Sequence, residues 1–354
     1  MRRCSRQLAW VGMAVLAGWA SAGGVFAQDR PETETFAPVL SEDLSLSLAE
    51  AAGGASAGAE ASPAPEAPPA ETPKGDGPPL PLHSLEGMGG TTLVPMAYLV
   101  NRGPEGTVFG LPAASYTFLK AGEKMVNAFA VTETFYRRIE FGYGFNHVGL
   151  GDWPAAVENA TGVDLRHNYV EMHNFNLRGL LVEENTGSPA TPAVTGGVHF
   201  KYNQGIDSID HQLGGAAHSL GYERSNGVDY TLTASKTVPK IVFGRPLIAT
   251  AGLRFSQAAQ LGWLGFGDAY RLTWEASAVV PVIDNFCLGY EYRQKKNPYQ
   301  QLGHLVGDEE DWHAICFAWI LSEHLTFGGV WGHLGNLVNG DENGAWGFQF
   351  KYEF

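Results

Sequence analysis

Residues 344–354 read GAWGFQFKYEF, and this stretch decides the fold. Its aromatic side chains fall at every second position. Such alternation predicts a β-strand whose two faces meet different surroundings. The apolar face carries Trp346, Phe348, Phe350, Tyr352 and Phe354, and the opposite face carries Ala345, Gly347, Gln349, Lys351 and Glu353.

The same alternation recurs upstream over segments of about ten residues, which is the strand length of a membrane-spanning barrel. Soluble sandwiches also alternate, but their strands are shorter and their apolar faces are rich in Val, Ile and Leu. We therefore predict an all-β fold, a transmembrane antiparallel β-barrel of about twelve strands within a range of about ten to fourteen. The expected strands lie near residues 110–120, 124–133, 138–148, 168–182, 194–203, 228–238, 247–257, 269–280, 284–293, 311–321, 323–333 and 344–354.

Connection lengths support this interpretation, because outer-membrane barrels have short turns at the periplasmic end and long loops outside. The long connections predicted here are 149–167, 204–227, 258–268, 294–310 and 334–343. An additional apolar segment, residues 91–101, contains Pro95 and would leave the amino terminus outside the cell if it were a strand. It is either a luminal plug or a sign that the strands near 121–123 are wrongly paired.

The first 27 residues predict a signal peptide. Arg2, Arg3 and Arg6 precede an apolar run that is too short to span a bilayer as a helix. Small residues favour cleavage after Ala27, with Ala22 as the competing site. We expect an exported protein of the bacterial outer membrane, embedded in its lipids.

Residues 28–90 predict a disordered acidic spacer. They contain eleven acidic residues against Arg30 and Lys74, a net charge of −9. Their Ala, Pro, Gly and Glu content buries too little apolar surface to fold. The expected domains are thus a signal peptide (1–27), the spacer (28–90) and the barrel (91–354). The spacer could reach peptidoglycan or a periplasmic partner, whereas the absence of a basic surface argues against nucleic acid.

Charged residues on the predicted inward face are the main site candidates. They are Glu140, Lys201, Arg254, Arg271, Glu275, Glu291, Arg293, Lys351 and Glu353. Mixed charges inside a small barrel either pair with one another as structural filling or form a selectivity ring in an open pore.

Two cysteines remain after signal removal. If Arg293 pairs with Glu310, antiparallel register places Cys287 opposite Cys316, both facing inward, and a disulfide would be geometrically feasible in an oxidising compartment. Two small buried thiols explain the same residues.

No motif indicates catalysis. His218 and Ser219 are adjacent, so on a strand they would face opposite sides, and the pair lies in a predicted loop. The histidines show no metal-ligand spacing, and the acidic run 308–311 is typical of a solvated loop. We expect no cofactor, no bound metal and no enzymatic activity.

Several stretches resemble a proteobacterial family of exported proteins catalogued as domain of unknown function 3034. They are LGFGDAYRLTWEASA (264–278), LGYEYRQKKN (288–297), DEEDWHAICFAW (308–319), LTFGGVWGHLGNLV (325–338) and FKYNQG (200–205). The resemblance implies an outer-membrane barrel and transfers no functional residue. The aromatic carboxyl terminus, carried by Phe350, Tyr352 and Phe354, also resembles the signal read by the outer-membrane assembly machinery.

We expect a porin-like channel for small solutes, with a modest cation preference because the chain is acidic. The alternatives are a non-conducting structural or assembly barrel and, third, a lipid-modifying enzyme. Sequence leaves the solute, the oligomeric state and the openness of the lumen undetermined.

Overall fold

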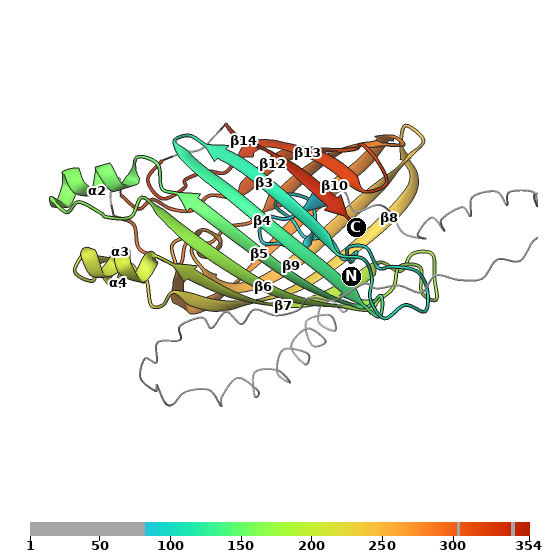
Figure 1. The fold of residues 1–354 in the computed structure, drawn as a ribbon, viewed down its shortest axis with the longest axis horizontal. Helices are drawn as coiled ribbons and strands as arrows, with labels where there is room; N and C mark the ends of the chain where they lie inside the picture. Colours follow the sequence, from blue (N-terminus) through green and yellow to red (C-terminus); the bar gives the residue numbers. More distant parts are fainter. Residues whose placement is uncertain (1–81, 303–304, 341–343) are drawn as a thin grey trace, which may run out of the picture. The chain divides into compact units, whose positions relative to one another are not determined.

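Twelve strands close into one antiparallel barrel in the computed structural model, which describes residues 82–302, 305–340 and 344–354 (Figure 1). Each strand pairs with its neighbours in the chain, and β14 closes the barrel against β3. This confirms the predicted fold and its strand number. The strands are β3 (Ala113–Ala121), β4 (Lys124–Phe135), β5 (Ile139–Gly149), β6 (Tyr169–Val182), β7 (Ala193–Gln204), β8 (Asn226–Val242), β9 (Arg245–Ala258), β10 (Phe266–Ile283), β11 (Phe286–Arg293), β12 (Trp312–Ile320), β13 (Leu325–His333) and β14 (Ala345–Glu353).

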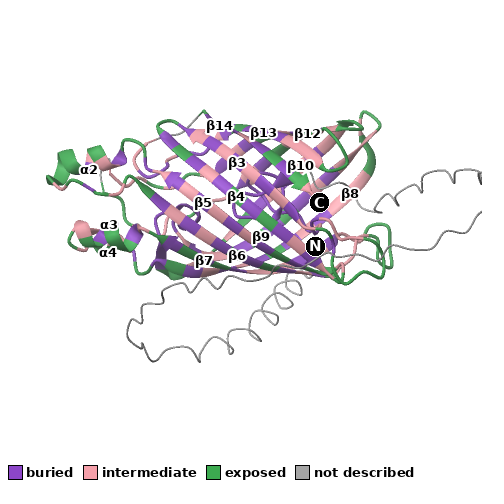
Figure 2. Ribbon diagram, viewed as in Figure 1, coloured by how far each residue is buried: buried purple, intermediate pink, exposed green. Residues whose placement is uncertain are grey.

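The two faces of the strands differ as the alternation predicts (Figure 2). On β14, Trp346 and Phe350 are nearly half exposed on the outside, whereas Gln349 and Lys351 are buried inside the barrel. An apolar exterior and a polar interior are the arrangement expected of a barrel in lipid.

The two ends of the barrel carry different connections. At one end, the short-turn rim, strands are joined by residues 136–138, 183–192, 243–244, 284–285 and 321–324. At the other end, the long-loop rim, the connections are 122–123, 150–168, 205–225, 259–265, 294–311 and 334–344. The long loops contain α2 (Trp153–Thr161), α3 (Ile206–Gln212), α4 (Ala216–Leu220) and the 3-10 turn η1 (Gln260–Gly262), and the helices α2, α3 and α4 lie together at that end in Figure 1.

Residues 82–100, here called the luminal segment, lie inside the barrel (Figure 1). All of them are buried except the half-buried Tyr98. The segment contains the short strands β1 (Leu82–His83) and β2 (Gly89–Gly90). Residues 91–101 are therefore a plug, and β3 and β4 join through a tight turn at Gly122 as predicted.

The predicted domain boundary at residue 91 is corrected by this segment. Residues 82–90, assigned to the spacer from their sequence, are buried within the barrel because their polar groups bond to its inner wall. The signal peptide and residues 28–81 of the spacer lie outside the described residues. No helix in the described part of the chain is long and apolar enough to cross a membrane.

Glycines on the inner wall make room for the luminal segment. In β5, the motif FGYGF places Gly142 and Gly144 inward. A Cβ at Gly142 would lie 2.4 Å from the carbonyl oxygen of Gly87, and one at Gly144 would lie 2.6 Å from that of Glu86. The close approach of two backbones thus requires glycine at both positions.

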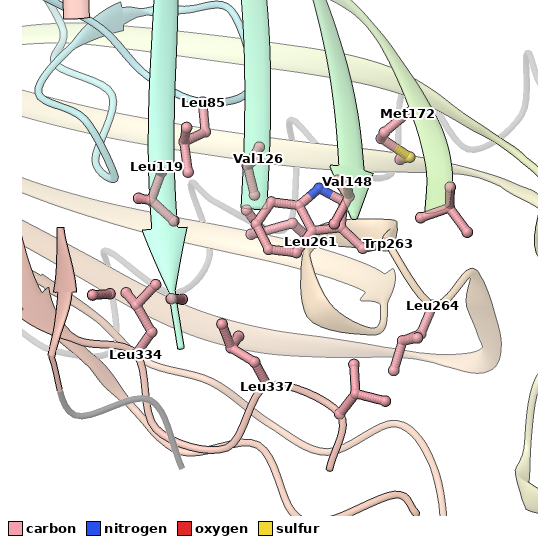
Figure 3. Close-up of a cluster of buried hydrophobic side chains, with 14 of the residues drawn as sticks. Leu85, Leu119, Val126, Val148, Met172, Leu261, Trp263, Leu264, Leu334 and Leu337 are labelled. Carbon is pink, nitrogen blue, oxygen red and sulfur yellow. The ribbon is translucent and has the colours of Figure 1, made fainter. Parts of the chain in front are cut away.

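An apolar cluster fills the lumen near the long-loop rim (Figure 3). Inward side chains of β3 to β6 contribute Leu119, Val126, Val148 and Met172, and the 259–265 and 334–344 loops contribute Leu261, Trp263, Leu264, Leu334 and Leu337. Leu85 joins them from the luminal segment. The loops therefore fold inward over this end of the lumen and are packed there by apolar burial.

Candidate functional site

A single carboxylate of the luminal segment lies at the centre of the barrel's charges. Glu86 Oε1 lies 2.5 Å from Lys201 Nζ, and Glu86 Oε2 lies 3.1 Å from Arg254 Nη2 and 2.7 Å from Arg293 Nη1. These cations project inward from β7, β9 and β11 respectively. Three strands of the wall thus hold one side chain of the segment.

Two wall carboxylates complete this arrangement. Asp229 lies 2.8 Å from Lys201 and 3.0 Å from Arg254, and Glu275 lies 3.4 Å from Arg254. Three cations thus face three carboxylates, and their charges balance. An unpaired charge in this buried part of the lumen would destabilise the fold. The set is called the Glu86 cluster and comprises Glu86, Lys201, Asp229, Arg254, Glu275 and Arg293.

Further wall carboxylates bind the backbone of the luminal segment. Glu291 Oε2 accepts hydrogen bonds from the backbone N–H of Leu93 at 2.6 Å and of Val94 at 3.0 Å. It also accepts one from the hydroxyl of Thr91 at 2.5 Å. These bonds satisfy the backbone N–H groups of Leu93 and Val94, which lie outside β1 and β2 and would otherwise be buried and unpaired.

A buried ion pair anchors the other end of the segment. Arg178 Nη2 lies 2.7 Å from Glu140 Oε1. Arg178 also donates to the carbonyl oxygen of Met96 at 2.7 Å, and Glu140 accepts from the backbone N–H of Val100 at 2.8 Å. Neither charged side chain is more than 2% exposed. The pair therefore links the wall to the luminal segment through both of its members.

A solvent-open pocket lies beside the Glu86 cluster, towards the long-loop rim. Its cationic lining residues are Lys201, Arg254, Arg271, Arg293, Lys295 and Lys296, against the two carboxylates Asp229 and Glu309. Glu309 is paired with Lys295 at 2.7 Å. Burial lowers the pKa of Lys295, and the nearby Glu309 acts in the opposite direction. We call this space the basic pocket.

All nine charged residues selected from the sequence lie at inward-facing positions of their strands. The structure brings Lys201, Arg254, Glu275 and Arg293 together in one cluster, and Arg271 lines the basic pocket beside them. Glu140 and Glu291 bind the luminal segment at separate points. Lys351 lies 2.5 Å from Glu353 and belongs to neither group.

Sequence reasoning missed Glu86, Arg178 and Asp229, and it selected neither Lys295 nor Lys296 of the basic pocket. Arg178 and Asp229 continue the polar alternation of β6 and β8, so the period-two pattern could have found them. Glu86 gave no such signal, because it lies in a Gly-containing stretch directly after the Pro-rich spacer.

The cysteine register is corrected by the structure. Arg293 pairs with Trp312 rather than Glu310, which shifts the ladder by two residues and places Cys287 opposite Ala318 and Cys316 opposite Gly289. Both thiols are buried and free. The shift arises because residues 294–311 form the loop, so that β12 begins only at Trp312.

The remaining motifs have local partners. The ring Nδ1 of His218 lies 2.5 Å from Asp210, and the hydroxyl of Ser219 donates to the carbonyl of Gly215, so these two side chains are not paired. In the acidic run, Glu309 pairs with Lys295 and Asp311 accepts from Tyr292, so this run is less solvated than expected. Across the described ranges, no group of three or more His, Cys, Asp or Glu residues is arranged to hold a metal ion.

Comparison with solved structures finds distant barrels. KdgM porin has a TM-score of 0.40 at 7% identity, covering 68% of this chain and 99% of its own. NanC porin has a TM-score of 0.37 at 9% identity, covering 69% and 98%. The COG4313 outer membrane channel from Pseudomonas putida F1 has a TM-score of 0.39 at 11% identity, covering 69% and 94%. These similarities are too distant to transfer a function.

No curated protein matches the sequence. One family does, over residues 81–350, which span the luminal segment and nearly all of the barrel. The match begins one residue before the first described residue of the luminal segment, so the segment is part of the family's domain. The chain belongs to the family described as protein of unknown function (DUF3034).

Proposed function

We propose that the protein is a porin-like channel of the bacterial outer membrane, with the luminal segment as its constriction. The observation that carries the proposal is a closed barrel with an apolar exterior and a charged interior, because a polar lumen serves the passage of solutes rather than stability in lipid. By the same rule the short-turn rim faces the periplasm and the long-loop rim faces outward.

Conductance in planar bilayers tests the proposal. Mature protein, checked for folding by its heat-modifiable migration, is expected to give discrete channel events. A variant that lacks residues 82–100 is expected to give larger events, because the deletion empties the lumen of buried side chains. The deletion variant also shows that the bilayers report an open barrel. Silence from the folded full chain beside a conducting deletion variant contradicts the channel.

A non-conducting structural or assembly barrel is the second candidate, and the buried luminal segment favours it. Eighteen of its nineteen residues are buried (all but Tyr98), and the wall binds it at Glu86, Glu291 and Glu140. In this form the acidic spacer would tether the barrel to peptidoglycan or a periplasmic partner. A pull-down in which deletion of residues 28–81 leaves every partner in place argues against the tether. Neither candidate includes catalysis.

A further inference from the structure

Two cationic side chains at the mouth of the basic pocket are not paired with a carboxylate of the described chain. Within the described chain, Arg271 and Lys296 form no ion pair, and Arg271 Nη1 donates instead to the carbonyl of Ala269 at 3.0 Å. Lys296 is exposed and Arg271 is partly exposed. The pocket therefore has two available positive charges at its entrance, while the acids in its lining are already paired with Lys201, Arg254 and Lys295.

The floor of the pocket consists of cations that already hold a carboxylate. Arg254 binds Glu86 through two nitrogens, with Nη1 at 3.2 Å from Oε1 and Nη2 at 3.1 Å from Oε2. Such two-point pairing matches guanidinium to the planar carboxylate group. Glu86 belongs to the luminal segment rather than to the wall, so a second carboxylate can pair with Arg254 and Arg293 when the segment shifts and Glu86 keeps Lys201 as its cation.

We propose that the basic pocket binds small carboxylate-bearing solutes and that the bound carboxylate competes with Glu86 for Arg254 and Arg293. The proposal rests on the porin-like function and names its solute class. It also reverses the cation preference expected from net acidity, because the pocket lining holds six cations against two carboxylates, whereas residues 28–90 carry a net charge of −9. Binding would loosen the luminal segment at its central contact.

Calorimetric titration of the mature full chain in detergent with citrate tests the proposal. Citrate is expected to bind, glucose is not, and raising the salt concentration is expected to weaken binding because part of the pocket is solvent-exposed. Inorganic phosphate is the comparison anion. Phosphate binding as tight as citrate would overturn the carboxylate class and leave a general anion site.

Three variants locate the site. The double variant R271Q/K296Q removes both unpaired cations and is expected to weaken citrate binding about tenfold. R245Q, which removes an exposed cation at the short-turn rim, is the matched control and should bind as the wild type does. E86Q removes the competing carboxylate and should bind citrate more tightly. Equal affinity in the double variant and the wild type overturns the site, and unchanged affinity in E86Q overturns the competition.

The titration is independent of conduction. Citrate binding without channel events would contradict the channel but support the carboxylate site. Channel events without citrate binding would support the channel but contradict the carboxylate site.

Discussion

At the residue scale, Arg178 shows what a buried charge contributes to this barrel. It pairs with Glu140 inside the wall and also bonds to the luminal segment. Arg178→Met should lower the free energy of unfolding by about 3–5 kcal/mol, because it leaves a buried carboxylate without its cation. Urea titration of the barrel in detergent measures the change.

The control for this variant is Arg245→Met. Arg245 pairs with Asp284 at the short-turn rim, where their side chains are 43% and 98% exposed. Solvent screens such a pair, so the expected loss is about 0–1 kcal/mol. Equal losses in the two variants would show that the Arg178 pair contributes nothing beyond its surface counterpart.

At the element scale, the luminal segment depends on the glycines of β5. Gly144→Val places a side chain where the backbone of Glu86 now lies. Overpacking of this kind costs about 1–3 kcal/mol, and we expect it to displace the segment rather than the strand. Faster hydrogen exchange of the amides in residues 82–100, with β5 still protected, is the expected result.

Gly179→Val is the matched control, because no atom lies within 4 Å of a Cβ at Gly179 on the outer face of β6. Its exchange pattern should equal that of the wild type. If Gly144→Val also exchanges like the wild type, glycine is not required for the segment to fit.

The last strand carries the proposed assembly signal. Phe350 and Tyr352 lie on the exposed face of β14, and Phe354, which directly follows the strand, is also exposed. Phe354→Ala should reduce the fraction of chains found as folded barrels in outer-membrane fractions several-fold, since Phe354 is part of the proposed signal. Phe243→Ala removes another exposed aromatic at the same rim and should have little effect. Equal yields from the two variants would leave Phe354 as an ordinary strand residue.

At the scale of the whole molecule, the exposed aromatic side chains of the outer surface indicate that the barrel is surrounded by lipid. Trp274, Trp319, Trp331 and Trp346 are exposed by 46–59% on the outside, whereas Trp312 is fully buried inside the barrel. In vesicles made with brominated acyl chains, we expect strong quenching of tryptophan fluorescence, because bromine reaches only lipid-facing rings. A Trp312→Phe variant should keep the quenched component. Fluorescence insensitive to bromination would contradict a lipid-embedded barrel.

The sequence by itself determined the closed antiparallel barrel, a strand number of about twelve and which charged side chains face inward. Alternation with a period of two is a local property, since each residue's side of a strand follows from its neighbours in the chain. This is why the inward orientation of Glu291 and Lys351 could be predicted without knowing any of their contacts.

Only the tertiary structure decided what fills the lumen. The luminal segment has no alternation, and its burial depends on contacts between residues far apart in the chain, such as Glu86 with Arg254 and Arg293. The cysteine register likewise depended on where the 294–311 loop ends. The basic pocket combines residues of β7, β8, β9, β10 and β11 with the 294–311 loop, beside a carboxylate that composition alone would assign to the spacer. Pairing across such distances is set by closure of the barrel around the segment, which no local pattern encodes.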